Sequence, residues 1–542
     1  MDVTTALDRD RFLKTIKEKT EWDIIIIGGG ATGLGTALDA ASRGYSTLLL
    51  EQADFAKGTS SRSTKLIHGG VRYLAQGNIQ LVYSALKERG SLLKNAAHLV
   101  KRQAFIIPCY SFVSKMKFLI GLKLYDWLSG NLSFGKSAFL GKEEISRRLP
   151  GINPKNLVGG IEYFDGQFDD ARLAVNLAQT SAELGGNLLN YFKVTGLLKA
   201  NGRINGVCAL DVESQQEYFL KAKVVINATG IFVDDVLQMD TPGRKALVRP
   251  SQGVHLVVNK SFLNGSSAMM IPETADGRVL FAVPWHNHIL LGTTDTPLES
   301  NSLEPVALEK EIRFILDTVN KYLLIAPVEK DVLSVFAGLR PLAAPQNNTS
   351  PTKEISRDHK MMVSDSGLIT ITGGKWTTYR KMAEETVNKA IETGGLPAVA
   401  CNTRNIKIHG CIAMPADQQF SIYGTDAEEI IQLIKQSPAL GKSLVDGLPY
   451  TEAEVLWATR NEMARTVEDI LARRLRMLFL DARAAITAST RVAELMAAEL
   501  GYDKAWEEDQ VKDFTKLANP YLLVPGFQKN NEKLKEVSSI IV

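Results

Sequence analysis

The stretch from residue 23 to residue 51 constrains the fold more strongly than any other part of the chain. Four consecutive isoleucines after Asp23 predict a buried parallel strand. A helix over 34–43 and a second apolar strand ending at Glu51 come later. Between strand and helix lies a glycine-rich turn that contains Gly28, Gly30, Ala31, Thr32 and Gly33. This order predicts a Rossmann-like α/β unit that binds a dinucleotide, because the helix N-terminus faces the pyrophosphate and the acid accepts from a ribose hydroxyl.

Composition excludes several classes of protein. The 542 residues are too many for one core, so we expect two or three domains. A net charge of +3 argues against a dedicated nucleic-acid-binding protein. The four cysteines are scattered without a C-x-x-C pair, which favours a reducing compartment and predicts no metal site. We find neither a secretory leader nor an apolar run of about 18 residues, so we expect a cytoplasmic protein without a transmembrane segment.

Two later segments repeat the nucleotide-binding pattern. Residues 221–230 predict a buried strand, and its exit is formed by Ala228, Thr229 and Gly230. Residues 367–380 predict a strand, a turn at Gly373 and Gly374, and then a helix. We therefore expect a discontinuous nucleotide-binding domain over 20–95, 160–245 and 355–395.

The segments between these pieces are expected to form an inserted α+β domain. Runs of alternating character, such as 253–258 and 288–292, predict an antiparallel sheet. We assign 96–159 and 246–354 to this substrate or cap domain.

After residue 400 the sequence pattern becomes mainly helical. Thr451 and Glu454 form a capping box, and the apolar residues that follow recur at a helical period. Another helix is expected to end at Gly501. These patterns predict a helical domain over 400–525, followed by a flexible tail at 529–542.

The residues after Glu51 point to a family. Residues 59–74 combine hydroxyl groups and glycines where a permanently bound flavin needs donors along its length. Four further motifs follow in order: Asn-Ala-Thr-Gly (227–230), Gly-Leu-Arg-Pro-Leu (338–342), Ser-Arg-Asp-His (356–359) and Gly-Gly-Lys-Trp-Thr-Thr-Tyr-Arg (373–380). Together with the glycine fingerprint, they resemble the FAD-dependent glycerol-3-phosphate dehydrogenases of the D-amino-acid-oxidase superfamily. The resemblance implies an FAD cofactor, a helical accessory domain and a homodimer.

The resemblance also implies that FAD is held by all three pieces of its domain. The helix start after Gly373 and Gly374 would place its positive end at the flavin pyrimidine. Beyond the fingerprint, the expected cofactor residues are Glu51, Thr59, Ser60, Ser61, His68, Gly69, Ala228, Thr229, Gly230, Gly373, Gly374, Lys375 and Thr377.

Glycerol 3-phosphate, the substrate that the resemblance implies, carries a phosphate that needs fixed cations. For the substrate pocket the resemblance selects Arg72, Tyr73, Arg340, Arg357 and Lys375. Arg340 precedes Pro341 in an expected turn. Lys375 stands at an expected helix start, where a cation is disfavoured unless an anion is bound. A surface role is the alternative for each of these cations.

The implied reaction oxidises sn-glycerol 3-phosphate to dihydroxyacetone phosphate by hydride transfer to flavin N5, while a base takes the hydroxyl proton. A histidine suits this task, and His255 on an expected strand of the inserted domain is our candidate. His68 is expected to neighbour the flavin. A structural histidine is the alternative for both, and Arg340 could instead stabilise a developing alkoxide.

Residues 99–142 are unusually basic, with seven Lys and Arg residues and one acid, Asp126. The interleaved apolar residues suit an amphipathic helix that lies on anionic lipid. A helix packed on its own domain, with its lysines in solvent, is the alternative. The resemblance implies that oxidases carry a longer insertion than the stretch from Thr296 to Arg340, so a membrane quinone is the expected acceptor. The expected location is then the inner face of the cytoplasmic membrane.

Three other functions remain open on the sequence. One is a soluble glycerol-3-phosphate oxidase that reduces oxygen to hydrogen peroxide. Another is a related oxidase of an amine or hydroxy acid, which would need fewer cations. The third is a flavin-containing RNA-binding or scaffold protein, which would need a basic stripe or stacking aromatics. Residues 99–142 alone approach that pattern.

Overall fold

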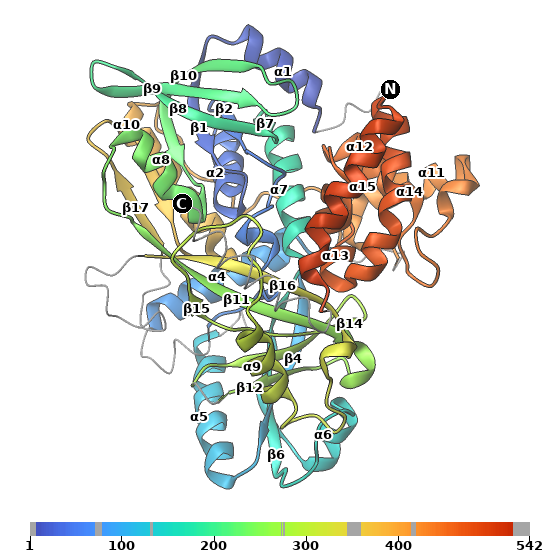
Figure 1. Ribbon diagram of the computed structural model, residues 1–542. Coiled ribbons are helices and arrows are strands. Elements are labelled where there is room, and N and C mark those ends of the chain that lie inside the picture. Colours follow the sequence, from blue (N-terminus) through green and yellow to red (C-terminus); the bar gives the residue numbers. More distant parts are fainter. Residues whose placement is uncertain are drawn as a thin grey trace, which may run out of the picture.

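The computed structural model describes residues 7–70, 79–129, 134–272, 274, 277–343, 359–413 and 419–523 (Figure 1). Three expected site residues, Arg72, Tyr73 and Arg357, lie outside these ranges, as does the expected tail at 529–542. Two large sheets and a group of helices on one flank make up the described chain.

An eight-stranded sheet carries the nucleotide-binding pattern. Its parallel strands, in spatial order, are β18 (Ile369–Thr372), β10 (Glu217–Asn227), β1 (Glu21–Ile27), β2 (Thr47–Leu50) and β7 (Asn187–Leu189). It is joined by the antiparallel strands β17 (Lys360–Val363), β8 (Phe192–Ala200) and β9 (Arg203–Asp211). The strands expected near 25, 225 and 370 pair directly, because Ile226 lies opposite both Ile26 and Ile369.

Helices cover this sheet, which explains why its strands are continuously apolar. The helix α2 (Ala31–Ser42) packs against α7 (Asp170–Glu183) and α10 (Tyr379–Gly394). It starts earlier than the expected 34, because the extended backbone of Gly30 already serves as its N-cap. The short helices α1 (Arg9–Glu18) and α8 (Val233–Asp240) belong to the same region.

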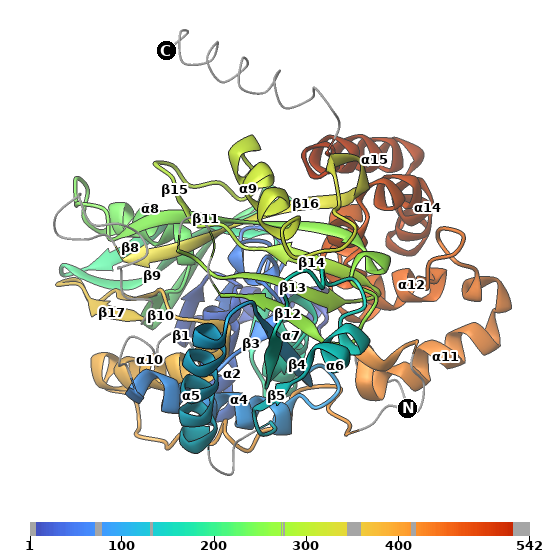
Figure 2. The same ribbon diagram turned by 90° about the horizontal axis from the view of Figure 1, so that it is seen from below.

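A ten-stranded sheet lies below the first in Figure 1 and faces the viewer in Figure 2. Its strands are β3 (Leu66–Ile67), β4 (Lys101–Cys109), β5 (Ala138–Leu140), β6 (Gly159–Gln167), β11 (Val248–Asn259), β12 (Ala268–Ile271), β13 (Leu280–Trp285), β14 (His288–Gly292), β15 (Thr296–Pro297) and β16 (Val332–Ala343). Apart from β4 with β12, its described pairs are antiparallel, which confirms the expected sheet type. The exact domain limits stay a prediction; β6, which begins beside the expected limit at 160, pairs with β4.

The helices α5 (Phe112–Ser129), α6 (Lys142–Arg148) and α9 (Glu309–Val319) belong to this second unit. The helix α4 (Ile79–Asn95) contacts residues 376–378 and also α5, and its Leu92 is buried in the core of the first unit. The helix α5 packs on β4 and β6, and its Leu122 is buried in the core that they share. Lys101 and Arg102, which we had grouped with this helix, lie on β4 instead.

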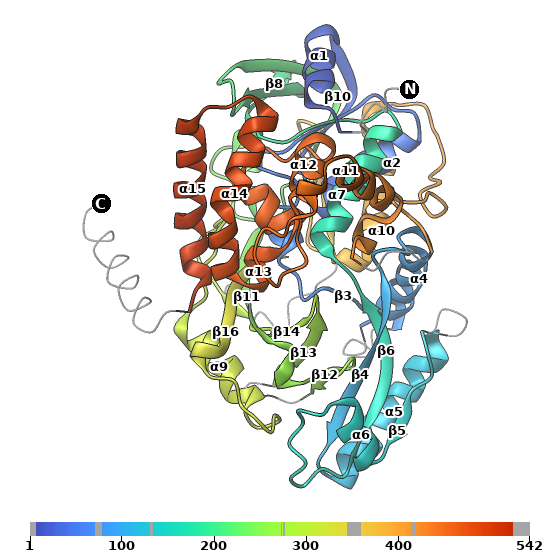
Figure 3. The ribbon, with the colours of Figure 1, turned by 90° about the vertical axis from the view of Figure 1, so that its right-hand side faces the viewer.

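The helical domain stands on one flank of the molecule (Figure 3). It contains α11 (Ala427–Gln436), α12 (Glu452–Asn461), a π-helix at Asp469–Arg474, α13 (Met477–Leu480), α14 (Ala482–Leu500) and α15 (Lys504–Ala518). The capping box is confirmed, since the N–H of Thr451 donates to Glu454 Oε2 at 2.7 Å. Gly501 ends α14 in the left-handed conformation (φ 75°), as expected. None of the helices within the described ranges is long and apolar enough to cross a membrane.

Candidate active site

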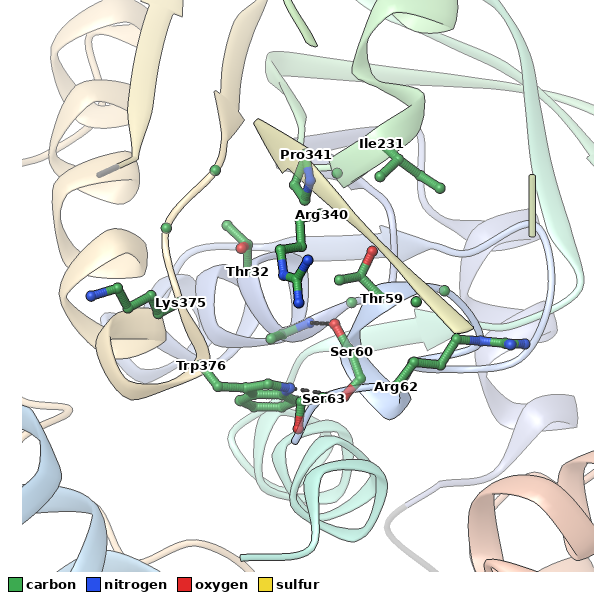
Figure 4. Close-up of a pocket in the computed structure, with 18 of the residues that line it drawn as sticks. Thr32, Thr59, Ser60, Arg62, Ser63, Ile231, Arg340, Pro341, Lys375 and Trp376 are labelled. Carbon is green, nitrogen blue, oxygen red and sulfur yellow. Dashed lines mark hydrogen bonds between the residues drawn. The ribbon is translucent and has the colours of Figure 1, made fainter. Parts of the chain in front are cut away.

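A cavity of about 510 Å³ lies between the two sheets. One wall, which we call the cofactor wall, consists of residues from 28–32, 228–232 and 371–377. The opposite cap wall consists of residues from β11, β16 and 293–295. Residues 59–65, the site loop, run between the two walls and contribute Thr59, Ser60, Ser63 and Thr64 to the lining (Figure 4).

The glycine turn of the cofactor wall leaves no room for side chains. Gly28 has φ 106°, and a Cβ there would lie 2.8 Å from the carbonyl oxygen of Ala228. A Cβ at Gly33 would overlap the carbonyl oxygen of Gly28, although Gly33 itself does not line the cavity. The backbone of β1, α2 and β10 therefore approaches as closely as glycine allows, which suits a pyrophosphate at the start of α2.

Glu51 stabilises the same turn from the end of β2. Its Oε2 accepts from the N–H of Gly29 at 2.6 Å, and its Oε1 accepts from the N–H of Ala53 at 2.9 Å. Burial raises the pKa of this carboxyl group, and the two N–H donors oppose that rise. Glu51 lines the cavity, and its contact with a ribose stays a prediction.

The hydroxyl groups of the site loop bind protein as well as facing the cavity. Ser60 Oγ accepts from the N–H of Ala31 at 2.9 Å, and Thr59 Oγ1 donates to the carbonyl of Leu339 at 2.6 Å. The carbonyl of Ser60 accepts from Trp376 Nε1 at 2.8 Å, as Figure 4 shows. The loop thus connects α2, the turn after β18 and strand β16 of the ten-stranded sheet.

His255 reaches the cavity from β11. Its ring stacks on Phe336 at 4.9 Å between centroids, and its Nε2 lies 2.9 Å from Thr64 Oγ1. Burial, followed by the charges of Lys65 and Arg340, holds the pKa of His255 well below its usual value. The imidazole is therefore neutral at physiological pH, which is the form that accepts a proton.

Arg340 reaches the cavity from β16 (Figure 4). Its guanidinium donates to the carbonyl of Thr294 at 3.1 Å, to Asp295 Oδ1 at 3.2 Å and to Thr293 Oγ1 at 3.2 Å. Gly253 on β11 leaves room for it, because a Cβ there would clash with the guanidinium. These contacts hold a cation beside the cofactor wall, where it can bind an anion.

The backbone at Arg340 differs from our expectation of a turn. Residues 338–342 lie inside β16, and Pro341 stands opposite Pro250 of β11. We were wrong because a proline usually interrupts a strand. Here two prolines face each other, and the carbonyl of Pro250 accepts instead from the N–H of Leu298 at 3.0 Å.

The remaining expected residues divide into two groups. Those that line the cavity are Gly28, Gly30, Ala31, Thr32, Glu51, Thr59, Ser60, His68, Ala228, Thr229, Gly230, Gly373, Gly374, Lys375 and Thr377. Those that do not line it are Gly33, Ser61 and Gly69. In Figure 4 the side chain of Lys375 extends away from Arg340, so the two cations do not converge on one point.

Several residues of the site escaped our sequence analysis. Thr64 lies inside the motif that we noted, but its partner His255 is 191 positions away. Trp376 also lies in a noted motif. Arg476, one of three buried arginines in residues 473–476, donates to the carbonyl of Ser61 in the site loop, and the density of arginines in this apolar segment is the signal that could have pointed to it.

Comparison with known proteins agrees with this geometry. Residues 23–380 match the family described as FAD dependent oxidoreductase, and residues 368–507 match the family described as C-terminal domain of alpha-glycerophosphate oxidase. The chain is 38% identical to a mitochondrial glycerol-3-phosphate dehydrogenase of Homo sapiens, over 98% of this chain and 77% of that protein. It is 38% identical to a mitochondrial glycerol-3-phosphate dehydrogenase of Arabidopsis thaliana, over 94% of this chain and 88% of that protein.

Solved structures show the same fold. The glycerol-3-phosphate dehydrogenase from Bacillus halodurans complexed with FAD superposes with a TM-score of 0.78 at 29% identity, covering 96% of this chain and 99% of that one. The L-alpha-glycerophosphate oxidase from Mycoplasma pneumoniae with FAD bound superposes with a TM-score of 0.55 at 18% identity, covering 69% and 95%. The second likeness concerns the fold alone.

Proposed function

The chain belongs to the FAD-dependent glycerol-3-phosphate dehydrogenases, and we propose that it oxidises sn-glycerol 3-phosphate to dihydroxyacetone phosphate and passes the electrons to a membrane quinone. Its cofactor is FAD. The residues present fit this cofactor, because the glycine turn, Glu51 and the start of α2 line one continuous cavity. Bound there, FAD supplies the acceptor for the hydride that leaves the substrate.

The observation that carries the proposal is the pairing of a neutral histidine with a fixed arginine on one face of the cap sheet. In the β11–β16 ladder, Ser251 lies opposite Arg340 and His255 lies opposite Phe336. Residues two and four apart along a strand share a face, so His255 and Arg340 both face the cavity. Such a pair can take a hydroxyl proton at one point and hold a phosphate or an alkoxide at the other.

The chain's own residues then divide the work. His255 accepts the proton of the substrate hydroxyl, and Thr64 fixes the orientation of its ring. Arg340 binds an oxygen anion of the substrate, and Asp295 with the carbonyl of Thr294 orients its guanidinium. The expected contributions of Arg72, Tyr73, Arg357 and Lys375 to phosphate binding stay predictions.

An anaerobic reduction experiment tests this function. We expect the purified yellow protein to be bleached by glycerol 3-phosphate and not by glycerol or amino acids. Bleaching by glycerol alone would show that the protein does not need the phosphate group to recognise its substrate. Bleaching by an amino acid would favour the amine or hydroxy-acid oxidase instead.

The exposed face of α5 supports a membrane-bound acceptor. Large apolar side chains recur along it at helical spacing and remain in solvent: Phe112, Val113, Met116, Ile120, Leu124 and Trp127. Val113 and Trp127 are each 76% exposed. Lys117 and Lys123 flank this stripe, and they suit anionic headgroups. The opposite face of α5 packs on its own sheet. The helix is therefore packed on its own domain along one face, while its other face is free to lie on lipid.

A neighbouring loop extends the apolar surface. Leu324 and Ile325 are 63% and 68% exposed. They follow Tyr322, whose ring meets that of Tyr110 just before α5. We propose that this combined surface rests on anionic lipid, and that the quinone is taken from the same membrane.

Vesicle flotation tests the lipid contact. We expect the protein to float with vesicles that contain anionic lipid, and the double substitution Ile120→Asp and Trp127→Asp to abolish flotation. Phe219→Asp, at an equally exposed aromatic on β10 of the other sheet, is the matched control and should float normally. Equal loss in both variants would contradict a specific lipid-binding face.

The acceptor is tested separately. A soluble short-chain quinone should reoxidise the bleached protein much faster than oxygen does. Oxygen consumption with stoichiometric hydrogen peroxide, without any added acceptor, would replace this proposal with the soluble oxidase. A homodimer and a place on the inner face of the cytoplasmic membrane remain predictions from the family resemblance.

A further inference from the structure

The site loop has a second side that faces away from the cavity and into the helical domain. There the carbonyl of Ser61 accepts from Lys65 Nζ at 2.7 Å and from Arg476 Nη2 at 2.8 Å. Arg476 comes from the segment between the π-helix and α13. The loop that contacts the cofactor region on one side is thus held on the other by a residue more than 400 positions later.

Asp170 at the start of α7 completes this support. Its Oδ2 accepts from Lys65 Nζ at 2.7 Å and from the hydroxyl and the N–H of Ser63 at 2.7 Å and 3.0 Å. Its Oδ1 accepts from Arg476 Nη2 at 3.0 Å. Lys65, Asp170 and Arg476 are fully buried, so these bonds act without competing water.

Arg476 itself is held in an unusual conformation. Its φ is 66°, which costs a non-glycine residue about 1 kcal/mol or more, so the surrounding contacts must impose this conformation. Its guanidinium lies over the rings of Phe479 and Trp285, and Nη1 donates to the carbonyl of Ala472 at 2.9 Å. This backbone turn aims the side chain out of the helical domain and into the site loop.

The site loop links the position of Arg476 to His255 and to the start of α2. Thr64 is three residues after the anchored Ser61, and its Oγ1 meets His255 Nε2 at 2.9 Å. Ser60 precedes Ser61 and binds the N–H of Ala31 at the start of α2. A shift of the loop backbone would therefore move the base and the start of the cofactor-binding helix together.

We propose that Arg476 is a positioning residue, and that the helical domain uses it to hold the site loop in the place that orients His255 and the flavin. The turnover part of this inference rests on the proposed function. The part that concerns FAD does not depend on which substrate is oxidised.

The test compares Arg476→Gln with Arg172→Gln in the full-length holoprotein. Arg172 is an equally buried arginine whose side chain joins α7 to the helical domain through Glu462 and the carbonyl of Arg474, rather than to the site loop. Both substitutions should lower the melting temperature, since each removes one cation from a buried carboxylate, Arg476 from Asp170 and Arg172 from Glu462. Only Arg476→Gln should reduce kcat about tenfold with KM within about twofold, and raise the dissociation constant of FAD about tenfold.

The outcomes separate positioning from general stability. Arg476→Lys keeps a cationic donor, so we expect it to recover part of kcat and the wild-type shape of the visible flavin band. An unchanged kcat and FAD affinity in Arg476→Gln would overturn the inference, as would losses in both variants that simply follow their melting temperatures. If Arg476→Gln does not fold, Arg476→Lys decides alone, through an altered or unaltered flavin band. If the wild-type flavin is not bleached by glycerol 3-phosphate, the proposed function fails, while FAD affinity still decides this inference.

Discussion

The cofactor wall and the cap wall enclose the same cavity, yet they are shaped by different parts of the chain. On the cofactor wall the backbone itself forms the surface, since Gly28 leaves no space for a Cβ, and Gly33, outside the lining, packs directly on the carbonyl of Gly28. On the cap wall, side chains form it, and Arg340 and His255 project from strands of ordinary geometry. We therefore expect added atoms to impair FAD binding at the cofactor wall, and removed functional groups to impair turnover at the cap wall.

The largest effect is expected from adding atoms directly behind the cofactor wall, against the backbone of Gly28. Gly33→Val would drive its side chain into the carbonyl oxygen of Gly28, so we expect protein without FAD and a loss of stability of roughly 3 kcal/mol or more. Flavin absorbance after gel filtration and thermal melting measure this. Gly121→Ala, in an open position on α5, is the control and should keep FAD. Full FAD content in Gly33→Val would contradict the role of the backbone.

Removing the base from the cap wall comes next. His255→Ala should lower kcat by about 10²- to 10⁴-fold while FAD content stays unchanged, because the neutral imidazole accepts the substrate proton. Single-turnover bleaching of the flavin separates this step from reoxidation. Turnover that stays near the wild-type value would remove His255 from the mechanism.

The cation of the cap wall should have a smaller effect that appears in substrate affinity. Arg340→Gln loses a charge-assisted contact worth roughly 1.5–3 kcal/mol, so kcat/KM should fall about 10- to 100-fold. Arg313→Gln, at an exposed arginine of α9 that pairs with Glu309, is the control and should leave kcat/KM unchanged. If both variants behave alike, Arg340 does not bind the substrate.

The pH dependence of turnover tests the state of the base. Because burial lowers the pKa of His255, its imidazole remains neutral down to well below pH 6.5, and kcat should begin to fall only as the pH drops through that lowered value. We choose kcat rather than kcat/KM, since the free substrate phosphate also titrates near pH 6. An acid limb centred near the ordinary histidine value would show that His255 is not shielded in the working enzyme.

The smallest expected effect concerns the orientation of the base. Thr64→Val keeps the shape of the side chain and removes its hydrogen bond to His255, so kcat should fall by about 2- to 10-fold. Thr64→Ser retains the hydroxyl and should stay close to wild type. A Thr64→Val enzyme with unchanged kcat would mean that stacking on Phe336 alone orients the ring.

The difference between the two walls also explains which features could be predicted from the sequence. The turn from Gly28 to Gly33 is local, so its geometry follows from neighbouring residues, and β1, α2 and β2 appear in the expected order, with α2 starting three residues before the expected 34. Contacts between residues far apart in the sequence cannot be predicted in this way. Thr64 meets His255 only after β11 has joined the second sheet, and no short motif encodes that register.

The same reasoning applies to Arg340 and Arg476. Arg340 could be assigned to the site because the family motif contains it, but a strand with facing prolines was not foreseeable from propensity. Arg476 lies in a segment that we described only as helical. Its role depends on packing between a late segment and an early one, which a single sequence does not display.

The buried arginines also bear on the order in which the chain matures. Asp54, fully buried beside the cofactor wall, has its charge balanced by Arg473 and Arg474. During synthesis from the N-terminus, these arginines emerge after nearly all of the nucleotide-binding segments have left the ribosome. Until then Asp54 lacks the two cations that balance its charge in the folded chain. Stable capture of FAD is therefore expected to be a late, nearly post-translational event, and a chain truncated before residue 473 should need chaperones to stay in solution.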